Sequence, residues 1–240
     1  MSSFAGSERE HAPSMSVLVL NAAAIRRRPD RASLGERLDS GRGMQQSDPP
    51  GIDVLFEGPY SWDPGVGQTC LYDAPVARQR GVYLWTVPQG DGFLGHYVGM
   101  TGSSFGRRME EHRRMMIACE YRVYEAAAFR SGVLRTRWPG CFGSDRRSVR
   151  ECHEHAEALL PEQMEIIRAI RFFVAPMEVG RRLMERIEAT LDASIRSGAG
   201  TAGSFLERVR MKPRRESEPP VSCRVRASRA ILGLPAQVAA

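Results

Sequence analysis

The sequence predicts an α+β fold: a small, mostly antiparallel three-stranded sheet flanked by helices, with an N-terminal hairpin and a helical insertion. Residues 81–87 and 94–99 are rich in aromatic and β-branched residues, and the sequence PQGDG between them is typical of a hairpin turn. Apolar residues recur at helical spacing in 104–119 and 179–196. A third β-type run, 171–176, would complete the sheet.

Composition divides the chain into three predicted parts. Residues 1–50 are rich in proline, serine and glycine, which predicts a weakly ordered tail; the alternative is a basic arm that contacts the DNA backbone. Residues 51–210 are predicted to form the folded domain, with an insertion at about 120–165. Residues 211–240 are predicted to be a C-terminal extension.

Further elements are expected inside the folded domain. Residues 52–56 and 68–72 resemble strands separated by a turn-rich segment, which predicts a hairpin at the sheet edge. Residues 148–170 read as a helix that breaks or restarts at Pro161, because proline suits the first turn of a helix.

The charge balance is basic. The net charge is +6, and Lys212 is the only lysine, so arginine supplies nearly all of the positive charge. A bias in genome composition explains most of this ratio, but guanidinium groups also bind phosphates bidentately. The balance is therefore compatible with nucleic-acid binding without establishing it.

Cysteine usage and hydropathy bear on location. The five cysteines are scattered without paired spacing, which predicts reduced thiols in a cytoplasmic protein. No continuous apolar run is long enough for a membrane span, so no membrane association is expected.

The first helix is amphipathic and begins at a serine, Ser103 or Ser104, that can cap it. Its apolar side carries Phe105, Met109, His112, Met116 and Cys119. Arg108 lies at the border of this side next to His112, whereas Arg107 points away. We therefore expect Arg108 to reach a site shared with the strands.

The helix at 179–196 has one acidic residue in an unusual position. Its apolar stripe comprises Leu183, Met184, Ile187, Leu191 and Ile195. Glu188 lies close to this stripe, and Glu185 lies further round on the outer side. A carboxylate against an apolar stripe usually has a partner or a metal ion.

Two tripeptides, Gly81-Val82-Tyr83 and Tyr97-Val98-Gly99, precede a helix that carries Phe105-x-x-Arg108-x-x-x-His112. Together they resemble the GIY-YIG nuclease superfamily. The resemblance covers roughly residues 80 to 210 and implies a metal-dependent endonuclease that hydrolyses DNA phosphodiester bonds.

The resemblance also implies roles for particular residues. Glu188 would bind a divalent ion, Mg²⁺ or Mn²⁺, with Glu185 as the alternative ligand. Arg108 would hold the scissile phosphate, and Tyr83 would activate the attacking water. Tyr97 and His112 would position the phosphate or share the proton transfer.

One departure from the superfamily keeps other functions open. Its members often carry an asparagine about fifteen residues after the metal-binding glutamate, but the only asparagine here is Asn21. The alternatives are a non-catalytic nucleic-acid-binding protein on the same fold, or an RNA-directed hydrolase.

A zinc site is a weaker candidate. Its ligands would be Cys141, Cys152, His153 and His155. On a helix the two histidines point about 200° apart at 100° per residue, so they cannot both face one ion. This stretch more simply predicts a surface helix.

Overall fold

The computed structural model describes residues 51–65, 67–141, 146–198 and 200–240, except for the side chains of 146–149 and 151–153. The segment 1–50, predicted to be a weakly ordered tail, lies outside the described residues.

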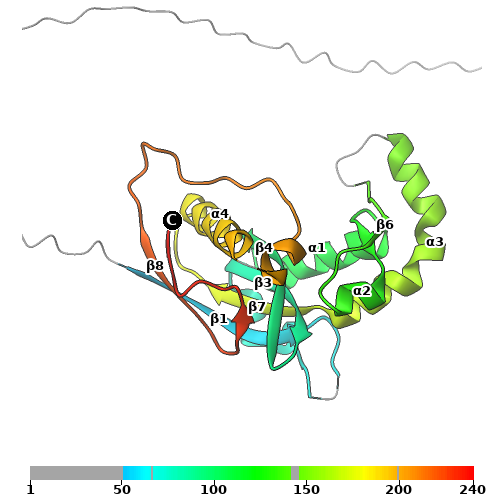
Figure 1. Ribbon diagram of the computed structural model, residues 1–240, viewed down its shortest axis with the longest axis horizontal. Helices are drawn as coiled ribbons and strands as arrows, with labels where there is room; N and C mark the ends of the chain where they lie inside the picture. The colour runs from blue at the N-terminus through cyan, green and yellow to red at the C-terminus, as the bar shows by residue number, and fades with distance from the viewer. Residues whose placement is uncertain (1–50, 66, 142–145, 199) are drawn as a thin grey trace, which may run out of the picture. The chain divides into compact units, whose positions relative to one another are not determined.

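A mixed sheet, eight-stranded within the described residues, forms the centre of the domain (Figure 1). Its middle contains β7 (Arg171–Pro176), β3 (Gly81–Gln89) and β4 (Gly92–Thr101) side by side. Within this group β3 pairs antiparallel with both β7 and β4, and β3 and β4 form the hairpin that the turn sequence indicates. The candidate site is built on this central part of the sheet.

The predicted three-stranded sheet is wrong, because further strands extend it on both sides. They are β1 (Ile52–Ser61), β2 (Thr69–Cys70), β8 (Ser222–Ala227), β9 (Ile231–Leu232) and β10 (Gln237–Ala239). The sheet is also mixed, since β1 pairs parallel with β8, and β4 pairs parallel with β9. In β8 the alternating Cys223 and Val225 are buried while the arginines point outward, a short pattern that does not reveal its distant partner.

The predicted N-terminal hairpin is wrong as well. The strand β1 runs on to Ser61, and β2 pairs with its end in parallel, with Tyr60 opposite Thr69. The chain then continues in two short 3₁₀ helices, η1 (Leu71–Asp73) and η2 (Pro75–Arg78). A turn-rich segment between two strands therefore does not establish that they are antiparallel.

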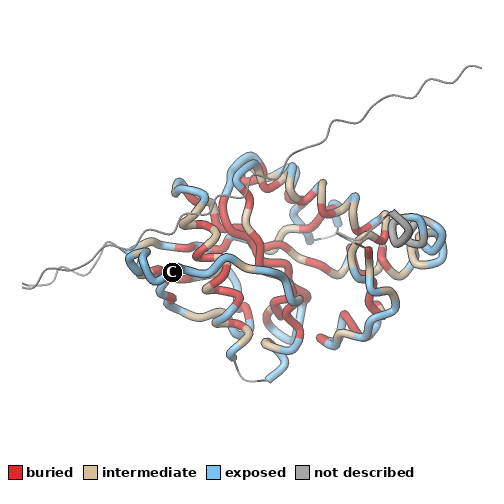
Figure 2. The backbone as a smooth tube through the Cα atoms, turned by 90° about the horizontal axis from the view of Figure 1, so that it is seen from above, coloured by how far each residue is buried: buried red, intermediate tan, exposed pale blue. Residues whose placement is uncertain are grey.

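Buried residues, red in Figure 2, gather in the middle of the domain. Alternation along β3 divides them between two hydrophobic cores. Tyr83 and Trp85 join the core under α1 (Phe105–Ile117). Val82 and Leu84 join the core under α4 (Arg181–Ser197). The two helices therefore cover opposite faces of the sheet, as the period-two pattern of a strand requires.

The insertion packs on the α1 face. It contains β5 (Val123–Tyr124), α2 (Ala126–Arg130), β6 (Thr136–Trp138) and α3 (Arg146–Ala169). The strands β5 and β6 form a separate antiparallel pair. The predicted restart at Pro161 is not seen, since α3 is one helix that contains this proline.

The structure bears on two of the expectations, the lack of a membrane span and the reduced state of the cysteines. No helix in the described part of the chain is long and apolar enough to cross a membrane. Cys70, Cys119 and Cys223 are free thiols, whereas Cys141 is disulfide-bonded, so the expectation of reduced thiols is wrong for that residue. The cytoplasmic location stays a prediction.

Candidate active site

A cleft of about 630 Å³ lies along the edge of β4, between residues of α1 and α4. Only Phe93 and Leu94 of β4 pair with β9, so no strand among the described residues flanks the later part of β4 on that side. We call this space the edge cleft; Tyr97, Arg108 and Glu188 line it. Helices from opposite faces of the sheet thus contribute to one site.

The glycines of both tripeptides are required by close packing. A Cβ on Gly99 would lie 2.4 Å from Cζ of Tyr83, because the tyrosine ring lies over this position. Gly81 has a φ of +153°, and a Cβ there would lie 2.1 Å from the carbonyl oxygen of Ala175. Gly99 of the second tripeptide therefore leaves the space that the ring of Tyr83, from the first tripeptide, occupies.

Tyr83 is fully buried, and it does not line the edge cleft. Its hydroxyl oxygen lies 2.7 Å from Nε2 of His112. Burial raises the pKa of the Tyr83 phenol well above its usual 10.0, and the nearby Tyr97 raises it further. Arg108 lowers this pKa, but burial outweighs it. Tyr83 is therefore a neutral phenol that does not line the edge cleft.

His112 links Tyr83 to a second tyrosine that the motif does not contain. The Nδ1 atom of His112 lies 2.8 Å from the hydroxyl oxygen of Tyr121. Burial, followed by the charge of Arg108, lowers the pKa of His112 well below 6.5, so the imidazole is neutral at pH 7. A neutral ring has one donor and one acceptor nitrogen, so the two tyrosine hydroxyls play opposite hydrogen-bonding roles.

Tyr97 is half-buried and presents its side chain to the edge cleft. Its ring centroid lies 6.1 Å from that of Tyr83. Burial and the charge of Glu188 raise the pKa of Tyr97, while Arg108 lowers it. Among the tyrosines of the two tripeptides, Tyr97 is therefore the one that a bound molecule can reach.

A bulge in the hairpin sets the direction of Tyr97. Tyr97 is opposite Trp85, but the next residue along β3, Thr86, is opposite Gly95. His96 is thus the extra residue, and such a bulge re-aims side chains at functional sites. Sequence alternation alone does not show where a bulge falls.

Arg108 is the arginine that reaches the site, as its helix position predicts. Its Nη1 donates to Oε2 of Glu111 at 3.1 Å. Burial lowers the pKa of Arg108, but Tyr83 and Glu111 outweigh this effect, so the net shift is upward and the side chain stays charged. Arg107 is exposed and pairs with Glu111 from outside, at 3.3 Å.

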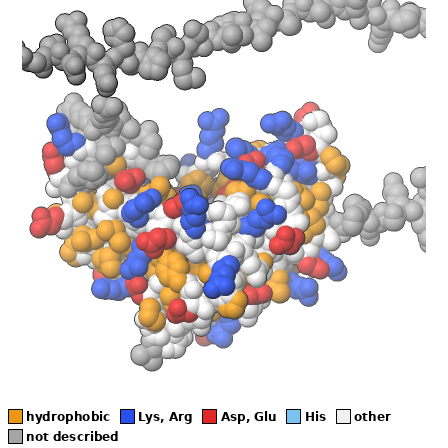
Figure 3. Space-filling model, turned by 180° about the vertical axis from the view of Figure 1, so that it is seen from behind, with side chains coloured by type: hydrophobic (Ala, Val, Ile, Leu, Met, Phe, Trp, Pro, Cys, Tyr) orange, Lys and Arg blue, Asp and Glu red, His pale blue; other side chains and the backbone are white. Residues whose placement is uncertain are grey.

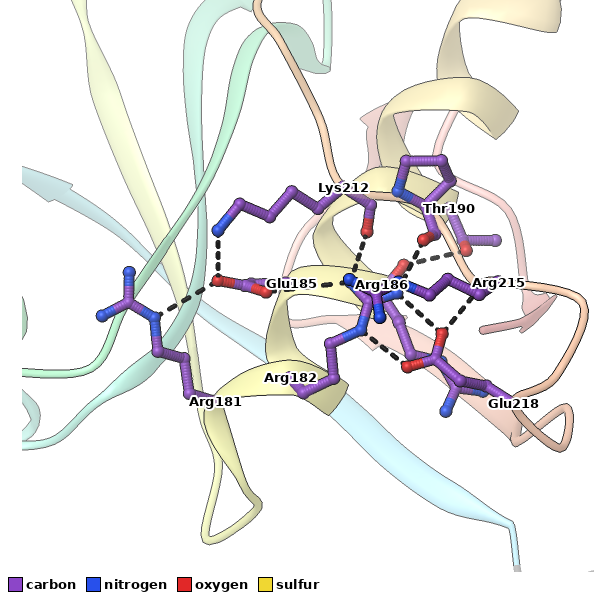
Figure 4. A network of polar contacts seen from close by, with 9 residues as sticks. Arg181, Arg182, Glu185, Arg186, Thr190, Lys212, Arg215 and Glu218 are labelled. Carbon is purple, nitrogen blue, oxygen red and sulfur yellow. Dashed lines mark hydrogen bonds and ion pairs between the residues drawn. The ribbon is translucent and has the colours of Figure 1, made fainter. Parts of the chain in front are cut away.

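Glu188 and Glu185 also differ as the helical spacing suggests. Glu185 accepts from Arg181 at 3.2 Å and from Lys212 at 2.9 Å, so its charge is already compensated (Figure 4). Glu188 takes part in no ion pair within the described residues. Burial raises its pKa to about 7, the backbone N–H of Met100 opposes this, and Glu185 reinforces it. Glu188 is therefore the carboxylate that a cation would stabilise most.

Residues 207–219, which we call the basic strap, run over α4 and line the cleft. Arg182 fixes this segment by donating to the carbonyl oxygens of Lys212 and Pro213 and by pairing with Glu218 at 2.7 Å (Figure 4). Arg210 and Lys212 of the basic strap line the edge cleft. Sequence reasoning missed these residues, because the strap has no helical or strand pattern.

A second cleft, of about 600 Å³, adjoins the first. We call it the aromatic cleft; it shares Tyr97, Arg108 and Arg210 with the edge cleft and is lined further by Tyr121 and Arg208. The signal that could have indicated it is the cluster of tyrosines in the insertion, close in sequence to His112.

Positive charge is also spread over the surface. On the face in Figure 3, lysine and arginine side chains are interspersed with aspartate and glutamate. The positive charge of that face is therefore spread among negative charges rather than gathered into one patch.

The residues present fit Mg²⁺ better than zinc. Within the described residues no group of three or more His, Cys, Asp and Glu side chains gathers as a metal site. Mg²⁺ keeps most of its waters and needs only one or two carboxylates, so the uncompensated Glu188 suits it. Of the zinc candidates, Cys141 is disulfide-bonded, His155 is exposed, and the side chains of Cys152 and His153 lie outside the described residues.

Comparison with family models, with curated proteins and with solved structures finds no match to this chain.

Proposed function

We propose that this protein is a metal-dependent endonuclease that hydrolyses DNA phosphodiester bonds and is related to the GIY-YIG nucleases through its motifs. One observation carries the proposal: Arg108 of α1, the uncompensated Glu188 of α4 and Tyr97 of β4 line the same cleft. A fixed cation, a carboxylate and a phenol in one cleft match the needs of phosphodiester hydrolysis.

Arg108 binds the scissile phosphate in this proposal. Its guanidinium is charged and held by Glu111, so it offers donors in a fixed direction. The same contact compensates the negative charge that develops on the phosphate oxygens in the transition state. Arg210 and Lys212 of the basic strap supply further positive charge along the cleft.

Glu188 holds the divalent ion, Mg²⁺ or Mn²⁺. When bound, the ion supplies Lewis-acid stabilisation of the phosphate and lowers the pKa of a water molecule. The carboxylate must ionise to serve as a ligand, and its raised pKa of about 7 makes this costly without a cation. Metal binding and proton release are therefore coupled at Glu188.

Tyr97 lines the edge cleft, so we assign the proton transfer of the reaction to its phenol. Tyr83 lines neither cleft and His112 lines only the aromatic cleft, so we assign them a positioning role rather than direct contact with the attacking water. This assignment revises the role that the resemblance implies for Tyr83, since its side chain is fully buried.

A non-catalytic nucleic-acid-binding protein is the second candidate. The observation that favours it is the lack of any asparagine between Glu188 and the end of the chain. The same basic groups along the clefts would then bind phosphates without cutting them.

The test is nicking of a supercoiled plasmid with Mg²⁺ or Mn²⁺, with EDTA and Glu188→Gln as controls. We expect metal-dependent nicking that both controls abolish. Glu157→Gln, a change at an exposed residue of α3, is the matched variant that retains activity. Metal-dependent nicking by Glu188→Gln at the wild-type rate would remove Glu188 from the mechanism. DNA binding without nicking by the wild type would favour the second candidate.

A further inference from the structure

The aromatic cleft has the composition of a nucleotide-binding site. Tyr97 and Tyr121 line it with half-buried rings, and Arg208 and Arg210 lie at its opening. Both arginines are exposed, and neither forms an ion pair within the described residues. Aromatic rings beside uncommitted guanidinium groups are the combination that binds single-stranded nucleic acid through its bases and phosphates.

The acidic residues of this cleft do not cancel its charge. Glu207 accepts a hydrogen bond from Tyr124 at 2.5 Å and pairs with Arg122 at 2.7 Å, so it is already compensated. Glu120 is the other carboxylate in the lining. Against it stand Arg208 and Arg210, so the cleft keeps a net positive charge even though Arg108 is paired with Glu111.

The aromatic cleft is large enough for a ligand the size of one nucleotide. A volume of about 600 Å³ lies in the range of sites for small molecules of nucleotide size, about 300–1,000 Å³. In a duplex a base is stacked and paired, so its face is not available to a tyrosine ring. A base that enters this cleft must therefore be unpaired, or must leave the stack.

We propose that the aromatic cleft binds one unpaired nucleotide of a DNA strand, directly beside the phosphate held in the edge cleft. The two clefts share Tyr97, Arg108 and Arg210, so adjacent nucleotides of one strand can occupy them. The position beside the scissile phosphate rests on the proposed function. The substrate is then single-stranded DNA, or DNA with an unpaired segment, rather than uninterrupted duplex.

Binding is measured first, in EDTA, so that the result does not depend on cleavage. Fluorescence anisotropy compares a labelled single strand with the duplex of the same sequence. We expect the wild type to bind the single strand more tightly. Arg208→Ala and Tyr121→Leu should weaken single-strand binding about tenfold, as loss of a phosphate contact or a stacked base does. Arg229→Ala, which removes the same charge at an exposed position outside both clefts, should not change it.

Tyr121→Phe separates stacking from hydrogen bonding. It keeps the ring but loses the hydroxyl that contacts His112, so it should weaken single-strand binding less than Tyr121→Leu does. If Tyr121→Leu fails to fold, Arg208→Ala carries the test. Equal binding of single strand and duplex, or wild-type binding by Arg208→Ala, would overturn the proposal.

A cleavage assay then tests where the bound nucleotide lies relative to the cut phosphate. A single abasic position is moved along a cleavable strand, and we expect a tenfold loss of cutting only when it adjoins the cut phosphate. Metal-dependent cutting without this effect would leave the nuclease proposal standing and overturn the placement. Selective single-strand binding without any cutting would support the cleft and refute the nuclease.

Discussion

The ring of Tyr83 lies over Gly99, the residue directly opposite it on β4. A Cβ at Gly99 would approach Cζ of Tyr83 to 2.4 Å and its hydroxyl oxygen to 2.5 Å. The ring cannot move aside, because Tyr83 is fully buried among core residues and its hydroxyl is held by His112. Only glycine at position 99 leaves room for the Tyr83 ring.

Gly99→Ala should destabilise the protein strongly. The added methyl group overpacks a fixed core, which costs about 1–3 kcal/mol or more of unfolding free energy. Gly95→Ala is the control on the same strand, since its Cβ would meet nothing within 4 Å. Urea unfolding of both variants checks the prediction, and equal stabilities would contradict the packing described here.

Glu188→Gln should change how stability depends on pH. Burial raises the pKa of Glu188 in the folded protein to about 7 from its usual 4.5. Such a group stabilises the fold while protonated, below pH 4.5, and this contribution is lost as the pH rises to 7. In EDTA the variant should match the wild type at pH 4 and exceed it by about 1–2 kcal/mol at pH 8. Denaturant midpoints at both pH values measure this, and a constant difference would refute it.

Mg²⁺ should stabilise the wild type at pH 8, where ionised Glu188 meets the ion. A ligand that binds only the folded state at a hundred times its Kd adds about 2.7 kcal/mol. Glu188→Gln should lose this gain, whereas Glu157→Gln at an exposed site should keep it. Melting temperatures over a Mg²⁺ titration give the result. A similar rise in Glu188→Gln would place the ion elsewhere.

Tyr83→Phe should lower the nicking rate with little change in KM, because Tyr83 does not line the edge cleft. It should also cost roughly 1–2 kcal/mol of stability, since the buried nitrogen of His112 loses its partner. Tyr72→Phe removes an exposed hydroxyl that contacts Glu110, so both quantities should stay unchanged. Steady-state kinetics and unfolding curves test both effects. A full nicking rate in Tyr83→Phe would exclude Tyr83 from the mechanism.

Local patterns were sufficient for the centre of the molecule. Helical spacing selected Arg108 over Arg107 as the side chain that lines the clefts. The same spacing separated Glu188 from the ion-paired Glu185. Each of these predictions depends only on residues within one element, where geometry follows directly from the backbone period.

Long-range relationships were not predictable in this way. The pairing of Ile52 with Cys223 joins segments far apart in the chain, and no local pattern specifies that partner. The bulge at His96 depends on the register between β3 and β4, which the sequence of either strand alone does not specify. The contact of Tyr121 with His112 depends on the path of the insertion. The sheet was therefore predicted too small and the site too sparse.

The parallel pairing of β1 with β8 also constrains how the protein is made. On the ribosome β1 emerges early, but its partner β8 emerges only after about 170 further residues, so one side of β1 must wait without its neighbour. Val54 and Phe56 belong to the same core as Cys223 and Val225, and this core closes only after synthesis has passed β8. Contacts of such long sequence separation slow folding, and after β7 has paired with β1 the opposite edge of β1 stays open until β8 is made.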